Sequence, residues 1–524
     1  MPVLVVGLDS ADRGLLFEWA REGELPALAG LMETGSTARL RSVAELLPES
    51  VWPTVFTGCG PGRNGHYNHR CVRPGTYSLV PSPGRTYKRP LWELVSERGG
   101  RALLLDVAYT DPVPSERVVQ VAGWGLRGAL KPRSWPPELL GSLQARHGAY
   151  ARGLEEHYER SKRAERRHLR ESIRMAGRRT QIALELMATN DWDLTVIDYW
   201  EPHNAGHVFH PYLDGPVATR GDRGFARALL DVYRAVDEGL GRLLEAAAPE
   251  TDVIALSPYG LRRNRIGDRI LPRVLTGLGY TVERPVPPLV RAAHLARSAF
   301  PNSIRRQVNE RLPIDARMRL MERMWAEPVD WSRTRAVAEA EIGHGWIRIN
   351  LRGREPQGTV DPGAEYEELC EEIGFELCSL TDGETGKPIV AAVERSSDLL
   401  GGEHVAELPD LLVRWREGPF VRSARHPRLG LIKGDVHDVP MTEHSGEGFA
   451  IAAGPRMRSG ADLDGAEIAD LGATLAYLLG CPVPEDMDGR VLTELIEPRA
   501  LAVAPPTREA IDWFDERWGS GEAA

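Results

Sequence analysis

The sequence predicts an α/β protein built on a doubly wound, mostly parallel sheet with helices on both faces. Short apolar runs rich in β-branched residues alternate with stretches of helical periodicity, which is the pattern of successive βαβ units. Several runs lack polar alternation, as strands buried on both faces do. The chain has 524 residues, of which 42% are hydrophobic, and this is enough to bury a large core. The expected strands are residues 3–8, 102–106, 194–198, 253–257, 411–415 and 449–453.

The predicted domain organisation is one α/β domain over residues 1–500 followed by a tail at 501–524. Two helical additions to this domain are expected, at about 135–189, where the helical pattern is rich in Arg and Glu, and at about 285–325. They are expected to shape the entrance of a binding site, to form a dimerisation surface or to cover the sheet. The sequence does not choose among these roles, so a homo-oligomer stays open. The tail carries aromatic residues among charges, which predicts a docking helix with a disordered end.

Composition narrows the class of protein further. The formal net charge of −10 disfavours a general nucleic-acid binder. We find no apolar run of membrane-spanning length and no basic segment followed by a cleavage site at the start, so we expect a cytoplasmic protein with no membrane partner. The five cysteines are an odd number without close pairing in the sequence, which argues against a disulfide framework and against a zinc ribbon.

Residues suited to metal binding follow the expected strands. Asp9 ends the first apolar run, and the strand at 194–198 leads directly into His203 and His207, which are four residues apart. Imidazoles at that spacing can converge on one metal ion, and strand tips are where α/β enzymes place ligands. His444 comes just before another apolar run. The alternative for the first two histidines is a surface pair with no ligand.

A hydroxyl-rich segment follows at residues 50–65. It has the pattern of a helix that begins at Ser50 and closes in a glycine-rich turn.

Taken together and in order, these segments resemble the alkaline phosphatase superfamily, specifically the bacterial branch of its type I phosphodiesterase/nucleotide pyrophosphatase family. The resemblance extends from Asp9 to about Leu495 and implies an alkaline phosphatase-like fold that acts on a small-molecule phosphoester. In that superfamily two metal ions, usually zinc, flank a Ser or Thr nucleophile and stabilise in-line displacement at phosphorus. The segments that carry the resemblance are Thr57-Gly58-x-x-Pro61, Gly206-His207, residues 331–363 and Pro484 to Gly489.

The resemblance implies metal ligands, with departures. Asp9 matches a carboxylate of metal 2, while His207 and His444 match histidines of metal 1. His203 stands where the family has an aspartate, which leaves a three-histidine site with an open fourth position. The Asp and His that bind metal 2 are replaced by Pro258 and Tyr259. We therefore expect one zinc ion and no tightly bound second ion.

The position that the family uses for its nucleophile is occupied by Pro48 in this chain. Ser50 and Thr54 are the nearest hydroxyls. Ser50 is the better candidate because a helix N-terminus favours an anionic oxygen, and its alternative role is a structural cap.

Three further residues are candidates for substrate binding. Asn64 stands where the family's glycine-rich turn normally has a histidine. Arg352 and Arg354 carry guanidinium groups that fit phosphate oxygens, with a structural or solvent-exposed role as the alternative.

Two functions remain open. One is a metal-dependent phosphoester hydrolase with an altered, single-metal site. The other is a catalytically silent family member that keeps the fold as a binding or scaffolding protein.

Overall fold

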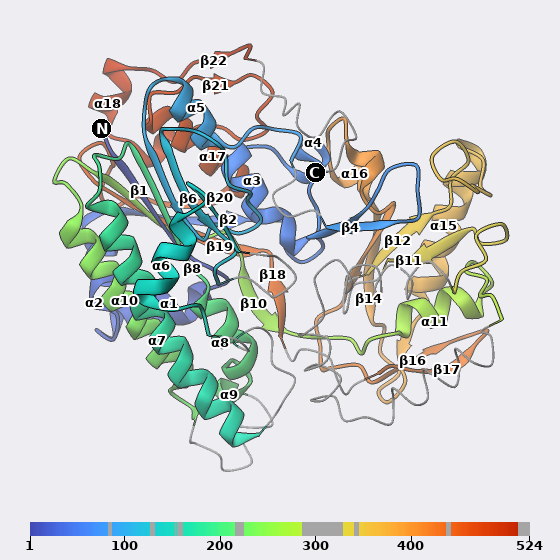
Figure 1. The fold of residues 1–524 in the computed structure, drawn as a ribbon. Coiled ribbons are helices and arrows are strands. Elements are labelled where there is room, and N and C mark those ends of the chain that lie inside the picture. The colour runs from blue at the N-terminus through green and yellow to red at the C-terminus, as the bar shows by residue number, and fades with distance from the viewer. Residues whose placement is uncertain are drawn as a thin grey trace. The chain divides into compact units, whose positions relative to one another are not determined.

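The computed structural model describes residues 1–81, 86–125, 132–151, 154, 161–214, 225–285, 328–339, 345–435 and 442–511. The chain divides into two compact units, coloured by residue number in Figure 1. Unit 1 consists of Met1–Asn68, Pro83–Arg263 and Pro440–Ala524, and unit 2 of His69–Ser82 and Asn264–Val439. The sequence patterns did not separate unit 2 from the predicted single domain.

Unit 1 contains a nine-stranded sheet in the order β20-β2-β19-β9-β1-β8-β5-β6-β7. The pairs around the central strand β1 are parallel, whereas β19 pairs antiparallel with both β2 and β9, and β7 pairs antiparallel with β6. The strands are β1 (Val3–Leu8), β2 (Ser36–Arg41), β5 (Ala102–Leu105), β6 (Val118–Ala122), β7 (Arg133–Trp135), β8 (Leu194–Tyr199), β9 (Asp252–Ser257), β19 (Glu447–Ala453) and β20 (Asp462–Glu467).

Helices cover both faces of this sheet. Successive apolar side chains of β1 point to opposite faces, so each face needs a cover. Val3 and Val5 belong to one hydrophobic cluster, and Leu4, Val6 and Leu8 belong to the other. The first cluster includes residues of α3 (Val51–Thr57), α5 (Leu91–Glu97) and α17 (Ile468–Leu478). The second includes residues of α1 (Arg13–Arg21), α2 (Pro26–Thr34), α7 (Lys162–Met187), α8 (Glu201–Phe209) and α10 (Ala228–Ala246). The doubly wound fold predicted from the sequence is confirmed.

Unit 2 has its own core around a four-stranded antiparallel sheet in the order β11-β12-β15-β14. The strand at 411–415 exists as predicted, but it is β15 of this sheet and not part of the large parallel one, so that expectation was wrong. The elements are β11 (Ala336–Ala338), β12 (Trp346–Ile349), β14 (Val390–Arg395), β15 (Leu411–Trp415), α11 (Ile270–Gly277), α15 (Ala364–Cys378) and α16 (Ser396–Leu399). A smaller sheet joins β13 (Thr381–Asp382), β16 (Ser423–His426) and β17 (Gly430–Lys433), and β3 (Arg70–Val72) pairs with β4 (Leu79–Pro81).

The two predicted helical additions have different outcomes. The first contains α6 (Leu139–His147) and α7, and α7 contributes to the core of unit 1, so it covers the sheet. The second, apart from its first residue, lies outside the described residues, as do the aromatic residues of the tail. In the part of the chain that the structure describes, no helix combines the length and apolar character needed to cross a membrane.

Candidate functional site

The three histidines predicted as ligands come together in unit 1. They lie on α8, which follows β8 of the large sheet, and on β18, which precedes β19 (Figure 1). His203 and His207 lie one turn apart on α8, which begins directly after β8, and both are buried. His444 lies on β18 (Thr442–Ser445), which pairs antiparallel with β10 (Gly260–Arg263). The surface-pair alternative for the first two histidines is therefore wrong.

A glycine between the two α8 histidines allows this approach. A Cβ atom at Gly206 would lie 2.1 Å from Cδ1 of Leu261. Leu261 is the residue of β10 in register with His444. Any larger residue at position 206 would force the Leu261 side chain or α8 to shift.

The ring nitrogens have a spacing that suits one metal ion. Nε2 of His203 and Nε2 of His444 are 3.4 Å apart, and one ligand atom from each of the three histidines lies within 4.8 Å of the others. Two nitrogens bound tetrahedrally to zinc at about 2.0–2.1 Å are about 3.3–3.4 Å apart. The nitrogens of His203 and His444 already have this separation, and His207 supplies a third ligand atom within 4.8 Å of both. Three neutral imidazoles are a ligand set that zinc accepts.

The second nitrogen of each α8 histidine is bound to the protein. Nδ1 of His203 is 2.6 Å from Oδ2 of Asp9, and Nδ1 of His207 is 2.8 Å from Oγ1 of Thr442. Because a carboxylate accepts hydrogen bonds, His203 donates its Nδ1–H, and Nε2 is left with its lone pair. Partners of this kind fix the tautomer and orientation of metal-binding histidines.

Asp9 has a different environment from that of a metal ligand. Its carboxylate is fully buried and accepts hydrogen bonds from Nε1 of Trp52 at 2.7 Å, from His203 and from the hydroxyl of Tyr259 at 3.1 Å. Burial raises the pKa of Tyr259 well above its ordinary value, so Tyr259 is a neutral phenol that donates to Asp9. With Pro258 next to it, this set does not fit a second metal ion.

A buried carboxyl group that the sequence analysis did not single out lies on the neighbouring strand. Asp198 of β8 is in register with Gly7 of β1 and is fully buried. Neither of its oxygens has a hydrogen-bond partner among the described residues. Burial, together with the nearby Asp9 carboxylate, raises the pKa of Asp198 well above its ordinary value. The signal in the sequence was a single acidic residue inside an otherwise apolar strand.

The two candidate nucleophiles donate their hydroxyl protons to the main chain. Ser50 does precede α3, but its side chain does not cap the helix, and its hydroxyl donates to the carbonyl of Leu47 at 2.7 Å. The expected side-chain cap was therefore wrong, because the chain enters α3 through a short 3-10 turn, Pro48–Ser50, that turns the hydroxyl backwards. The Thr54 hydroxyl donates to the Ser50 carbonyl at 2.9 Å, one turn earlier in the helix.

Asn64 forms side-chain hydrogen bonds within its own turn. Its Nδ2 donates to the carbonyl of Cys59 at 2.7 Å, and its Oδ1 accepts from the backbone N–H of His66 at 2.8 Å. The side chain therefore closes the turn around α4 (Pro61–Asn64).

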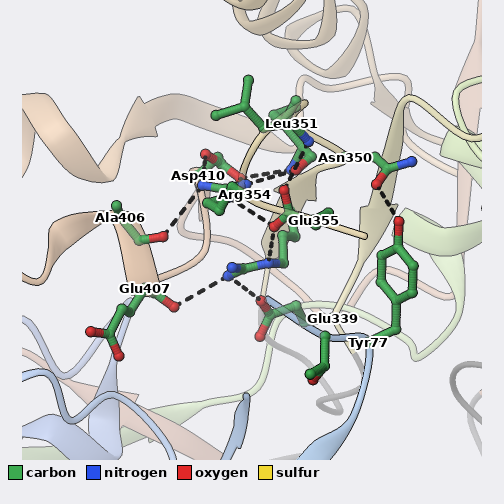
Figure 2. Close-up of polar contacts among 12 residues, drawn as sticks. Tyr77, Glu339, Asn350, Leu351, Arg354, Glu355, Ala406, Glu407 and Asp410 are labelled. Atoms are coloured by element: carbon green, nitrogen blue, oxygen red, sulfur yellow. Dashed lines mark hydrogen bonds and ion pairs between the residues drawn. The ribbon is translucent and has the colours of Figure 1, made fainter. Parts of the chain in front are cut away.

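Arg352 and Arg354 belong to unit 2, where Figure 2 shows the surroundings of Arg354. Arg354 donates to both oxygens of Asp410, at 2.8 and 2.7 Å, and to Glu355 at 2.8 Å. Glu355 in turn accepts from Arg348, so the guanidinium group of Arg354 is part of a buried ionic network. Arg352 is exposed and pairs with Asp361. These contacts favour the structural alternative for Arg354 and the solvent-exposed one for Arg352.

A comparison with known protein families identifies the family of this chain. Residues 3–435 match the family model described as type I phosphodiesterase / nucleotide pyrophosphatase. The chain therefore belongs to this family, as the sequence motifs predicted. The match ends before His444, so the place of His444 in the site rests on the geometry described above. No curated protein sequence matches the chain.

Solved structures show the same fold at low sequence identity. An inactive variant of murine ectonucleotide pyrophosphatase/phosphodiesterase 5 in complex with AMP has a TM-score of 0.50 and 12% identity, and the alignment covers 95% of this chain and 100% of that one. Phosphonoacetate hydrolase from Sinorhizobium meliloti in complex with phosphonoformate has a TM-score of 0.51 and 11% identity, with coverage of 92% and 95%. Both agree with the predicted alkaline phosphatase-like architecture.

Besides Asp198, two residues of the site were not predicted from the sequence, Trp52 and Thr442. Trp52 lies in the hydroxyl-rich segment at 50–65, and Thr442 lies two residues before His444. Neither carries a local signal, because their roles come from side chains that are distant in the sequence, Asp9 and His207.

Proposed function

We propose that this chain is a metal-dependent phosphoester hydrolase that works with a single zinc ion bound by His203, His207 and His444. The observation that carries the proposal is the convergence of three histidines, two of them with Nδ1 held by a protein partner. Zinc with three histidine ligands keeps a fourth position open, where it supplies Lewis acidity to a bound phosphoester.

Family membership supports the substrate class. The family is named for cleavage of phosphodiesters and nucleotide pyrophosphates. The two similar structures were solved with AMP and with phosphonoformate, which are small molecules that carry a phosphoryl or phosphonyl group. The net charge of −10 supports a small-molecule substrate over a nucleic-acid polymer. All five cysteines are free thiols, which supports the proposed cytoplasmic setting.

In this proposal the second metal position has been replaced by hydrogen bonds. Trp52 and Tyr259 donate hydrogen bonds to Asp9, and Asp9 accepts one from Nδ1 of His203. The carboxylate therefore orients a ligand of the first metal site without binding the metal itself. Loss of one ion from a two-metal mechanism removes several kcal/mol of charge stabilisation. We therefore expect hydrolysis that is slow for this family.

Ser50 remains the proposed nucleophile. Its hydroxyl must leave the carbonyl of Leu47 to reach a substrate, and Thr54 lies one turn farther along the helix with its own main-chain partner. The catalytically silent alternative is favoured by the same observation, because both hydroxyls are engaged with the backbone. It is also favoured by the three donors on Asp9.

Activity assays on the zinc-loaded chain separate the two functions. We expect slow, zinc-dependent hydrolysis of bis(p-nitrophenyl) phosphate, lost in His207→Ala and Ser50→Ala and largely kept in Thr54→Ala. His210→Ala is the matched control, because His210 ends the same helix but lies outside the three-histidine group. A chain that binds zinc but hydrolyses no phosphodiester, phosphomonoester or sulfate ester would support the silent binding protein.

A further inference from the structure

A buried ionic cluster contacts the first residue of α8 in unit 1. Arg179 of α7 is completely buried and lies between two acidic side chains. Its Nη1 donates to Oδ2 of Asp106 at 2.7 Å, and its Nε and Nη2 both donate to Glu201 at 3.2 Å. One guanidinium group therefore joins the end of β5 to the first residue of α8.

The surroundings of this cluster leave its groups little freedom. The guanidinium carbon of Arg179 lies 5.4 Å from the ring of Trp124 and 5.8 Å from that of Tyr150. The backbone N–H groups of Trp124 and Gly125 each donate to Asp106 at 2.6 Å. A Cβ at Gly125 would lie 2.5 Å from Nη2 of Arg179, so the backbone packs directly against the guanidinium group.

The same cluster holds the first turn of α8 at three positions. Trp200, the residue before the helix, donates its indole N–H to the carbonyl of Asp106 at 3.0 Å. Glu201 also accepts from the hydroxyl of Tyr150 at 3.2 Å, and Asn204 donates to that hydroxyl at 3.4 Å.

This turn determines where the metal-binding histidines lie. Trp200 stacks on His203, with ring centroids 5.4 Å apart and an interplanar angle of 23°. His203 and His207 lie on the same helix. A shift or rotation at the start of α8 would therefore move both rings relative to His444.

We infer that Arg179 is a positioning residue, which sets the position of α8 through Glu201 and Asp106 and thereby the convergence of the three histidines. The planar guanidinium fork can bond two carboxylates at once, whereas the single ammonium of a lysine cannot reproduce that geometry. The consequence for metal binding rests on the proposed function. The consequence for the order of α8 does not.

The test compares Arg179→Lys with Arg178→Lys. Arg178 is the neighbouring residue on α7, is half-buried and donates to the carbonyl of Ala149, so it is a matched control outside the cluster. One readout is zinc affinity, measured by competition with a chromophoric chelator. The other is hydrogen exchange of a peptide covering residues 200–209, compared with a peptide from α10.

We expect Arg179→Lys to bind zinc about tenfold more weakly, the lower end of the range for residues that orient ligands. We also expect faster exchange at 200–209 with little change in α10, whereas Arg178→Lys matches the wild type in both. Should Arg179→Lys fail to fold, Glu201→Gln decides with the same readouts, because the amide keeps the shape and loses the charge.

Unchanged exchange at 200–209 and unchanged zinc affinity in a folded variant would overturn the inference. If the wild type itself binds no zinc, the proposed function fails, and the exchange measurement alone decides whether Arg179 positions α8.

Discussion

Replacing Asp9 with asparagine separates two roles for this residue, ligand of a second ion and support of His203. Asparagine has nearly the same shape, and its amide oxygen can still accept from Trp52. Its NH2 group would then face Nδ1 of His203, which now donates to the carboxylate at 2.6 Å. Two donors cannot bond each other, so the proton of His203 moves to Nε2, the nitrogen that faces His444.

The size of the effect follows from this change of tautomer. A protonated Nε2 has no lone pair for a metal. Zinc binding therefore requires the proton to return to Nδ1, where the NH2 group of the new asparagine offers no acceptor, and this costs free energy. Loss of a partner that orients a metal-binding histidine weakens metal binding by about 10- to 100-fold, or about 1.4–2.8 kcal/mol. We expect a loss of zinc affinity in this range, with the number of ions per chain unchanged.

The assay is a competition titration against a chromophoric zinc chelator, combined with elemental analysis. Asp12→Asn is the matched control, because Asp12 caps α1 just after β1 and an amide oxygen can still accept from Leu15. If Asp9→Asn binds zinc as tightly as the wild type, the supporting role of Asp9 is refuted. If it loses one of two ions, Asp9 is a metal ligand after all.

Three further changes test neighbouring parts of the site. Gly206→Ala places a methyl group against Leu261 and should cost about 1–3 kcal/mol in urea unfolding while weakening zinc binding; equal stability would mean that α8 tolerates the shift. Tyr259→Phe removes one of three donors to Asp9 and should cost about 1 kcal/mol, with one zinc still bound; a second ion would contradict this. Asp198 has a raised pKa in the folded state, so its ionisation destabilises the fold as pH rises through that value. The free energy of unfolding of Asp198→Asn should therefore exceed that of the wild type at pH 8, with a smaller difference at pH 5. The same difference at both pH values would show that the Asp198 carboxyl does not titrate in this way.

The fold was largely predictable because its signals are local. Apolar runs marked five strands of the large sheet, β1, β5, β8, β9 and β19, and strand tips marked Asp9 and the α8 histidines. The strands β2, β6, β7 and β20 were not predicted. The strand at 411–415 shows the limit, since its composition resembles that of the others but it pairs in unit 2. Local composition predicts that a segment is a strand and does not say which sheet it joins.

The site was less predictable because its chemistry depends on partners distant in the sequence. Asp9 matched a metal ligand by its position, but the donors that surround it come from Trp52, His203 and Tyr259. For Ser50, the helix start was placed correctly, yet the preceding turn directs the hydroxyl to a carbonyl. Periodicity and motif spacing carry no information about either arrangement.

Elemental analysis of protein purified without chelator, and again after zinc loading and desalting, tests whether three histidines bind a single zinc ion. We predict about one zinc per chain in the wild type, a value near zero in His207→Ala and no change in His210→Ala. A wild-type chain that stays metal-free after loading with excess zinc, or one that holds two ions, would contradict this prediction.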